Sequence, residues 1–158
     1  MTDLPRNKKL FLDFCANLNP GPLTDEERLQ NQGVFEHFLS LARSGDIDRQ
    51  FDVAVKYLEG FWVESDHKQA AYWFTQAARN GHVDAQEALA GLYCLGMGVE
   101  CSATKAAQWM SLAAEGGNPS AQFDLARMFQ AGAGVPKDLA KAAFWFHRVV
   151  VNEKAPDY

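Results

Sequence analysis

The order of apolar and polar residues along this chain repeats every 36 residues. Trp73, Trp109 and Trp145 stand at that spacing, and alanine pairs accompany each of them. The run Leu89-Ala90-x-x-Tyr93 returns as Leu125-Ala126-x-x-Phe129, and a fainter version precedes both. A fixed period of this length is the signature of stacked, self-similar structural units. The pattern therefore predicts a repeat protein.

Within each unit the apolar residues follow i, i+3, i+4 spacing, which predicts two α-helices. The first helix is short and covers about residues 48–59 in the first unit, and a glycine loop leads to a second helix that carries the tryptophan. We expect one solenoid domain with this division: an N-terminal arm with capping helices and a degenerate half repeat (1–45), repeats at 46–81, 82–117 and 118–153, and a tail at 154–158.

The N-terminal arm carries an apolar helical stripe over residues 8–18, formed by Leu10, Phe11, Phe14, Cys15 and Leu18. Residues 19–22, Asn-Pro-Gly-Pro, end it. The arm either caps the first repeat, folding back over Phe51, Val55 and Leu58 as ordinary core, or docks a partner. A second helix begins at Thr24, where Thr24 and Glu27 form a capping box, and extends to about Ser44.

The three tryptophans are predicted to be stacked core anchors, because aromatic residues that repeat at helical spacing are usually core. The Gly-x-Gly-Val loops that begin at Gly96 and Gly132 lack the third glycine and the preceding strand of a dinucleotide site. We interpret their glycines as turn residues with positive φ. In the first repeat Trp62 takes the place of the second glycine.

Composition narrows the range of partners. The chain has 158 residues and a net charge of −5, without a basic run, so nucleic acid is not expected as a partner. No apolar run is long enough to span a membrane, and the N-terminus does not resemble a secretory signal, which favours a cytoplasmic protein. The three cysteines form no CxxC pair and are expected to be reduced thiols.

No arrangement of residues indicates catalysis or a cofactor. His37, His67, His82 and His147 show no metal-ligand spacing, and each is expected to be a solvated surface side chain. Nucleophile motifs and paired catalytic carboxylates are missing as well. We therefore expect a protein that is not an enzyme and has no cofactor.

The combination Ala-x-x-x-Leu-Ala/Gly-x-x-Tyr, Gly-x-Gly-Val, Lys-Ala-x-x-Trp and Ala-Ala-x-x-Gly resembles the Sel-one-like repeat family, a branch of the tetratricopeptide-like α/α solenoids. Residues 82–117 match best, and the whole match covers about 46–153. The resemblance implies an all-α, right-handed α/α superhelix of antiparallel helix pairs. It also implies a concave face for partners and an adaptor role, often in bacteria. A cysteine-rich subset that binds β-lactams has cysteines near positions matching Ala78 and Gln86, where this chain has none.

The expected function is a non-catalytic adaptor that binds a partner peptide or helix on the concave face. The alternative is a regulatory domain that binds a small molecule or a cell-wall-derived ligand. Helical spacing places four residues of each first helix opposite its buried side. The groove is then apolar at one end, acidic in the middle and mixed at the other, which suits a partner with basic and apolar anchors. The twelve candidate residues are Asp48, Phe51, Val55 and Leu58; Asp84, Glu87, Gly91 and Cys94; and Ser120, Phe123, Arg127 and Gln130.

The C-terminal helix departs from the repeat pattern. Val149 and Val150 replace the alanine pair, Glu153 replaces the closing glycine, and Phe144 replaces a polar residue. A terminal repeat must differ from internal ones, so the solenoid is expected to stop at about residue 151. The apolar end favours weak dimerisation through this helix.

Overall fold

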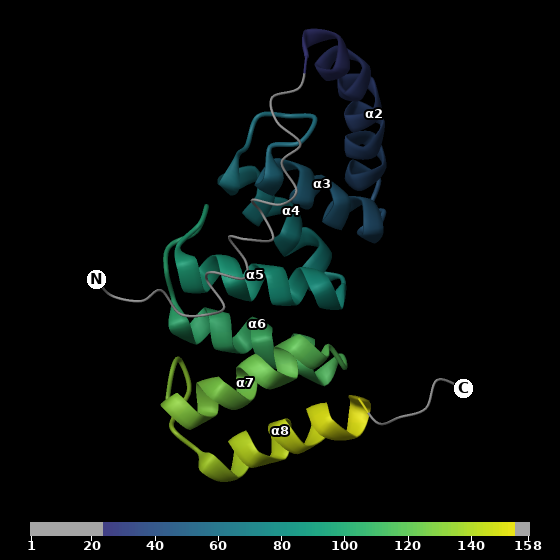
Figure 1. The fold of residues 1–158 in the computed structure, drawn as a ribbon. Helices are drawn as coiled ribbons and strands as arrows, with labels where there is room; N and C mark the ends of the chain where they lie inside the picture. Colours follow the sequence, from purple (N-terminus) through teal and green to yellow (C-terminus); the bar gives the residue numbers. More distant parts are fainter. Residues whose placement is uncertain (1–23, 154–158) are drawn as a thin grey trace.

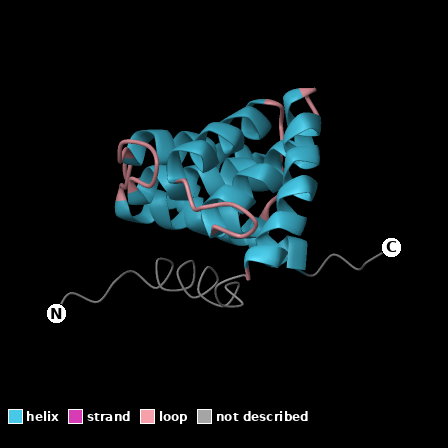
Figure 2. Cartoon of the chain, turned by 90° about the horizontal axis from the view of Figure 1, so that it is seen from above, coloured by secondary structure: helices cyan, strands magenta, loops and turns pink. Residues whose placement is uncertain are grey.

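The computed structural model describes residues 24–153 of the chain. In this range seven α-helices follow one another, joined by loops, and no strand is present (Figures 1 and 2). All helices between α3 and α7 have the same length of 13 residues. The helices are α2 (Asp25–Arg43), α3 (Ile47–Glu59), α4 (His67–Arg79), α5 (Val83–Leu95), α6 (Ala103–Glu115), α7 (Pro119–Ala131) and α8 (Leu139–Glu153).

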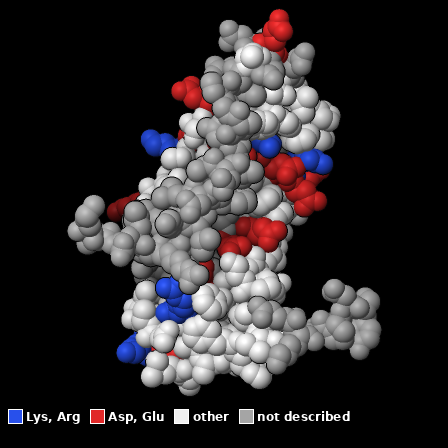
Figure 3. Space-filling view, viewed as in Figure 1, with Lys and Arg blue, Asp and Glu red and all other residues white. Residues whose placement is uncertain are grey.

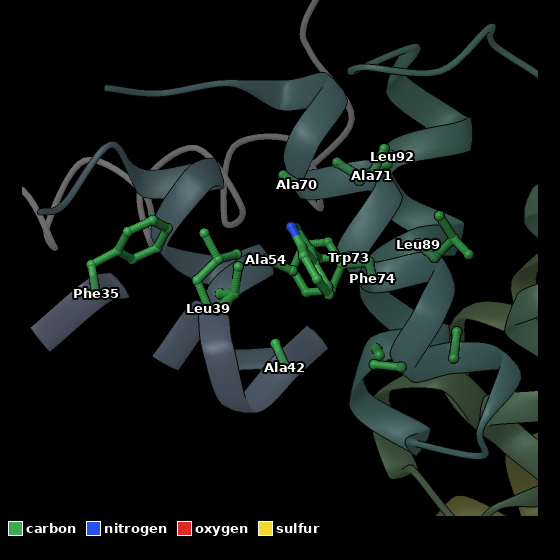
Figure 4. Close-up of a cluster of buried hydrophobic side chains, with 14 residues drawn as sticks. Phe35, Leu39, Ala42, Ala54, Ala70, Ala71, Trp73, Phe74, Leu89 and Leu92 are labelled. Atoms are coloured by element: carbon green, nitrogen blue, oxygen red, sulfur yellow. The ribbon is translucent and has the colours of Figure 1, made fainter. Parts of the chain in front are cut away.

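The helices stack in chain order, and each packs mainly against the next (Figure 1). This arrangement is an all-α repeat solenoid, as the sequence predicts. Its core consists of two clusters of buried side chains, one around Phe74 and Leu89 and the other around Met110 and Leu125. Figure 4 shows Trp73 and Phe74 between the α2 residues Phe35, Leu39 and Ala42 and the α5 residues Leu89 and Leu92.

Every helix from α3 to α8 begins with a side chain that accepts a backbone N–H of the first turn, which satisfies donors that would otherwise lack a partner. In each repeat a backbone hydrogen bond also joins the two helices, because the N–H of the residue that caps the second helix donates to the carbonyl of an aromatic residue in the first. The pairs are Asp66 with Tyr57, Ser102 with Tyr93 and Asp138 with Phe129, at 2.9–3.0 Å. The caps are Asp46, Asp66, His82, Ser102, Asn118 and Asp138.

The second glycine of each loop lies directly against the preceding repeat. Gly98 and Gly134 have φ values of 71° and 72°. A Cβ on Gly98 would lie 1.9 Å from the His67 carbonyl oxygen, and one on Gly134 would lie 2.0 Å from that of Ala103. These close approaches bring each loop onto the N-terminus of the previous second helix, so only glycine fits.

Trp62 adopts the same left-handed backbone as the two glycines that it replaces, with φ of 72°. This conformation is unfavourable for a bulky residue. Its ring packs edge-on against Phe38 of α2, with 5.7 Å between ring centroids, and the Lys56 ammonium lies 4.8 Å from its ring centroid. The first repeat therefore contacts α2 through a side chain where the later repeats make a backbone contact.

Three buried glutamines connect successive units. Each occupies the same position of a first helix, and its Nε2 donates to a carbonyl at the end of the previous second helix. The bond satisfies both buried polar groups, which would otherwise destabilise the interface. The pairs are Gln50 with Ala42 at 3.2 Å, Gln86 with Ala78 at 3.1 Å, and Gln122 with Ala114 at 3.0 Å.

Two of the predicted tryptophan anchors are buried, and the third is only half-buried. Trp73 is 6% exposed and Trp145 is 9% exposed. Trp109 retains more contact with solvent, yet it packs against both core clusters. It therefore connects the two clusters of the core.

Candidate interaction face

The twelve candidate residues lie on α3, α5 and α7, and none of them is buried. We call this set the candidate face. Each of these helices turns its other side into the core, where Val53, Leu89 and Leu125 are at most 1% exposed. Every third or fourth residue of a helix shares a side, so this contrast divides the first helices into a buried side and a side that stays at least partly open to solvent, called the free side below.

On α3 the candidate face is mainly apolar. Phe51, Val55 and Leu58 are half-buried and pack against the first core cluster, while Asp48 is exposed. The Phe51 ring contacts Phe74 edge-on at 5.6 Å between centroids. Part of each of these apolar side chains remains open to solvent and available for contact.

His82 belongs to this region, and its expected role as a solvated surface side chain is wrong. Its Nδ1 accepts the N–H of Ala85 at 3.2 Å, so it caps α5. Its ring stacks on Phe51 at 4.4 Å between centroids and 12° between planes. Its Nε2 lies 3.8 Å from Asp48 Oδ1. The cap of one repeat thus extends the candidate face of the repeat before it.

Asn118 also caps a helix and contacts the candidate face of the repeat before it, one repeat later. Its Oδ1 accepts the N–H of Ala121 at 2.9 Å and caps α7. Its Nδ2 donates to Asp84 Oδ1 at 3.2 Å and to Glu87 Oε2 at 2.8 Å. One amide therefore holds both carboxylates of α5 in place. Each carboxylate oxygen has a second lone pair, so the acidic pair retains acceptor capacity.

On α7 the candidate face is mixed. Phe123 is 45% exposed and contacts Phe146 of α8 edge-on at 5.5 Å between centroids. Ser120, Arg127 and Gln130 are exposed. Across the three helices, Phe51, Glu87 and Phe123 occupy equivalent positions, so an acidic site lies between two aromatic ones. Figure 3 shows carboxylates gathered over the middle of this view, around the level of α5.

Cys94 ends the α5 part of the candidate face. Burial of its thiol, together with the neighbouring Cys101 thiol and the Asp124 carboxylate, raises the pKa of Cys94. The Cys101 thiol donates to the Cys94 carbonyl oxygen at 3.4 Å. Both cysteines are free, and although the Cys94 thiol is partly buried, each residue as a whole keeps contact with solvent. A raised pKa means less thiolate at neutral pH, which is the opposite of an activated nucleophile.

Two surface hollows of the described residues are both shallow and open. One lies between the N-termini of α3 and α5 and is lined by Asp46, Asp48, Asn80 and His82 among others. The other lies beside α4 and is lined by Lys68, Tyr72, Arg79 and Val99 among others. Pockets that bind small molecules usually enclose most of the ligand surface.

Neither a metal site nor a membrane span occurs in the described part of the chain. No group of three or more His, Cys, Asp or Glu side chains between residues 24 and 153 could hold a metal ion. None of the helices in that range is long and apolar enough to cross a membrane.

A stack of helix pairs with a free side on every first helix defines a helical-repeat protein. The Sel1 repeat model matches residues 50–82, 83–118 and 119–148, and the chain belongs to the Sel1 repeat family. Proteins of this family are generally non-catalytic repeat scaffolds that bind other proteins. No curated protein matches the chain in sequence.

Solved structures carry the same fold. A Sel1 repeat protein from Oxalobacter formigenes is 34% identical, with a TM-score of 0.69 over 74% of this chain and 88% of that one. The protein c5321, a protective antigen of uropathogenic Escherichia coli strains with an SLR fold, is 32% identical, with a TM-score of 0.71 over 75% of this chain. This chain covers only 25% of c5321. Cysteine-rich protein B of Helicobacter pylori is 16% identical, with a TM-score of 0.62 over 83% of this chain and 92% of that one, and shares the fold.

Proposed function

We propose that this protein is a non-catalytic scaffold that binds a peptide or helix of a partner protein on the candidate face. The observation that carries the proposal is that none of the twelve positions is buried, although the opposite side of the same helices is fully packed. A solenoid offers its partners an extended surface of this kind rather than an enclosed pocket.

The composition of the candidate face favours a particular partner. Asp84 and Glu87 retain acceptor capacity, which suits a Lys or Arg side chain. Phe51 and Phe123 flank them on either side and suit apolar anchors. The fitting peptide therefore has a basic side chain between two apolar ones.

The test is a charge reversal, Asp84→Lys with Glu87→Lys, assayed by calorimetry against a partner obtained by pull-down and mass spectrometry. The matched control is Glu100→Lys with Glu115→Lys, because these carboxylates are exposed but lie off the candidate face. We expect the first pair to lose at least tenfold in affinity and the control pair to bind normally.

A neutral pair, Asp84→Asn with Glu87→Gln, separates charge from structure, since it keeps acceptors for the Asn118 amide. It is expected to lose affinity without a loss of helicity. Unchanged affinity in both face variants, with circular dichroism like that of the wild type, would remove the candidate face from the mechanism.

A small-molecule or cell-wall-derived ligand is not favoured by any of the hollows described above. Thermal shift against a metabolite panel tests this alternative. A rise of several degrees with one ligand, for a chain that captures no protein partner, would reverse the ranking.

We also propose weak self-association through α8. Phe144, Val150 and Val151 are 54%, 47% and 50% exposed. Exposed apolar side chains that lie close together on a terminal helix favour a second copy. Light scattering is expected to show a rising mass with concentration, and Phe144→Ser is expected to abolish the rise. A monomer at the highest concentrations of the wild type contradicts this proposal.

A further inference from the structure

The segment of this chain that precedes α2 has the chemistry that the candidate face accepts. We propose that residues 6–14 bind the candidate face of their own molecule and compete there with the partner. The inference rests on the proposed function, since it treats the candidate face as a peptide-binding surface. Residues 1–23 lie outside the described part of the chain, and the support comes from their sequence and from the surface that is described.

The first support is complementary composition. Arg6, Lys8 and Lys9 form the basic cluster of the segment, and the apolar residues Phe11 and Phe14 follow directly. The candidate face likewise has carboxylates on α5 and apolar side chains on α3. Both halves of the segment therefore have a matching surface on the first helices of two successive repeats.

The second support is the order of these groups along the chain. The apolar part of the segment is nearer in sequence to α2, and the apolar part of the candidate face is on α3, the helix that packs against α2. His82, which caps α5, stacks its ring on Phe51 of α3 at 4.4 Å between centroids, so the apolar part on α3 lies beside the N-terminal end of α5, where Asp84 and Glu87 are. With its phenylalanines over α3, the segment brings its basic residues to Asp84 and Glu87.

The third support is reach. Ten residues lie between Phe14 and Asp25, where α2 begins, and the eleven steps from one to the other span up to about 36 Å when extended. The 19 residues of α2 are about 28 Å long. Phe35, in the middle of α2, contacts Tyr57 near the end of α3 at 5.3 Å between ring centroids. The connection is therefore long enough to reach every residue of α3 on the candidate face.

Competition of this kind has a definite effect on affinity. When the segment occupies the candidate face for most of the time, the apparent affinity for a partner is reduced in proportion to the fraction of molecules whose candidate face is unoccupied. Removing the contact without touching the candidate face must therefore tighten partner binding. Variants of the segment should act in the opposite direction from Asp84→Lys with Glu87→Lys.

The experiment uses the full-length chain and needs no partner. Two-dimensional NMR spectra of Phe11→Ser with Phe14→Ser are compared with those of Asp13→Ser, a polar change in the same segment that leaves the apolar stripe intact. A third variant carries Arg6→Glu, Lys8→Glu and Lys9→Glu. We expect the apolar and the basic variants to shift backbone amide signals around Phe51, Val55 and Gly91, and the Asp13→Ser variant to shift only signals of its own segment.

Shifts confined to residues 1–23, or centred on α2 alone, would overturn the inference. So would shifts that disappear on dilution, because they would place the segment on a second copy. Both results leave the proposed function untouched, since Asp84→Lys with Glu87→Lys tests that separately. Conversely, the amide shifts can appear in a chain whose candidate face binds no partner.

Discussion

The close approach of Gly134 to the preceding repeat allows a quantitative test of how the units are joined. An alanine at this position incurs two costs. The left-handed backbone costs a residue with a Cβ about 1–2 kcal/mol. In addition, the Cβ would lie 2.0 Å from the Ala103 carbonyl oxygen, whereas ordinary contact begins at 3.4 Å. The loop must move by about 1.4 Å, and forced overpacking of this kind costs about 1–3 kcal/mol.

Gly132 is the matched control, because its φ of 73° is nearly the same as the 72° of Gly134. A Cβ on Gly132 would lie 3.3 Å from the Lys137 Cβ, so its backbone cost is retained with little overlap. We expect Gly132→Ala to lower the free energy of unfolding by about 1–2 kcal/mol and Gly134→Ala by about 2–5 kcal/mol. Urea unfolding followed by circular dichroism measures both. Equal destabilisation would show that position 134 needs glycine for its backbone angles alone.

Three further predictions concern single side chains. Trp109→Ala should lower the free energy of unfolding by about 3 kcal/mol, the low end for a large aromatic residue, since its ring is half-buried. An unchanged melting temperature would contradict its role between the two clusters. Gln122→Met should cost about 1–3 kcal/mol in urea unfolding because the Ala114 carbonyl loses a buried donor; a neutral effect would mean that this bond adds nothing. With the other two cysteines changed to serine, the alkylation rate of Cys94 should rise with pH around a higher midpoint in the folded protein than in urea. Because the pKa of this thiol is higher in the folded state, its contribution to stability should fall as the pH rises through that pKa.

The helical repeat was predictable because its signal is redundant. Tryptophans, alanine pairs and loop glycines all repeat at the same spacing, and each indicates the same helix pair. Positions of the free side follow from helical geometry once the buried side is known. The partner, the cytoplasmic location and the boundaries of the repeats stay predictions.

Other features depend on contacts between units that no local pattern reveals. His82 was expected to be solvated because it lies at a turn beside Gly81, yet it caps α5 and stacks on Phe51 from the repeat before. No role was predicted for the buried glutamines. Their recurrence among alanines, as in Ala85-Gln86 and Ala121-Gln122, is the signal that could have revealed them. The fate of the predicted helix at 8–18 lies outside the described residues.

The bonds of Gln86 and Gln122 have a consequence for how such a protein can change in length. A block of 36 residues, such as 82–117, contains both the glutamine that binds backward and the carbonyl that the next glutamine binds. It also contains a loop glycine and the helix end on which the next loop glycine rests. Tandem duplication of the block therefore supplies every contact that the new copy needs with its two neighbours. Insertions of other lengths disrupt these contacts, so the solvent-facing surface of the first helices can lengthen or shorten only by whole repeats.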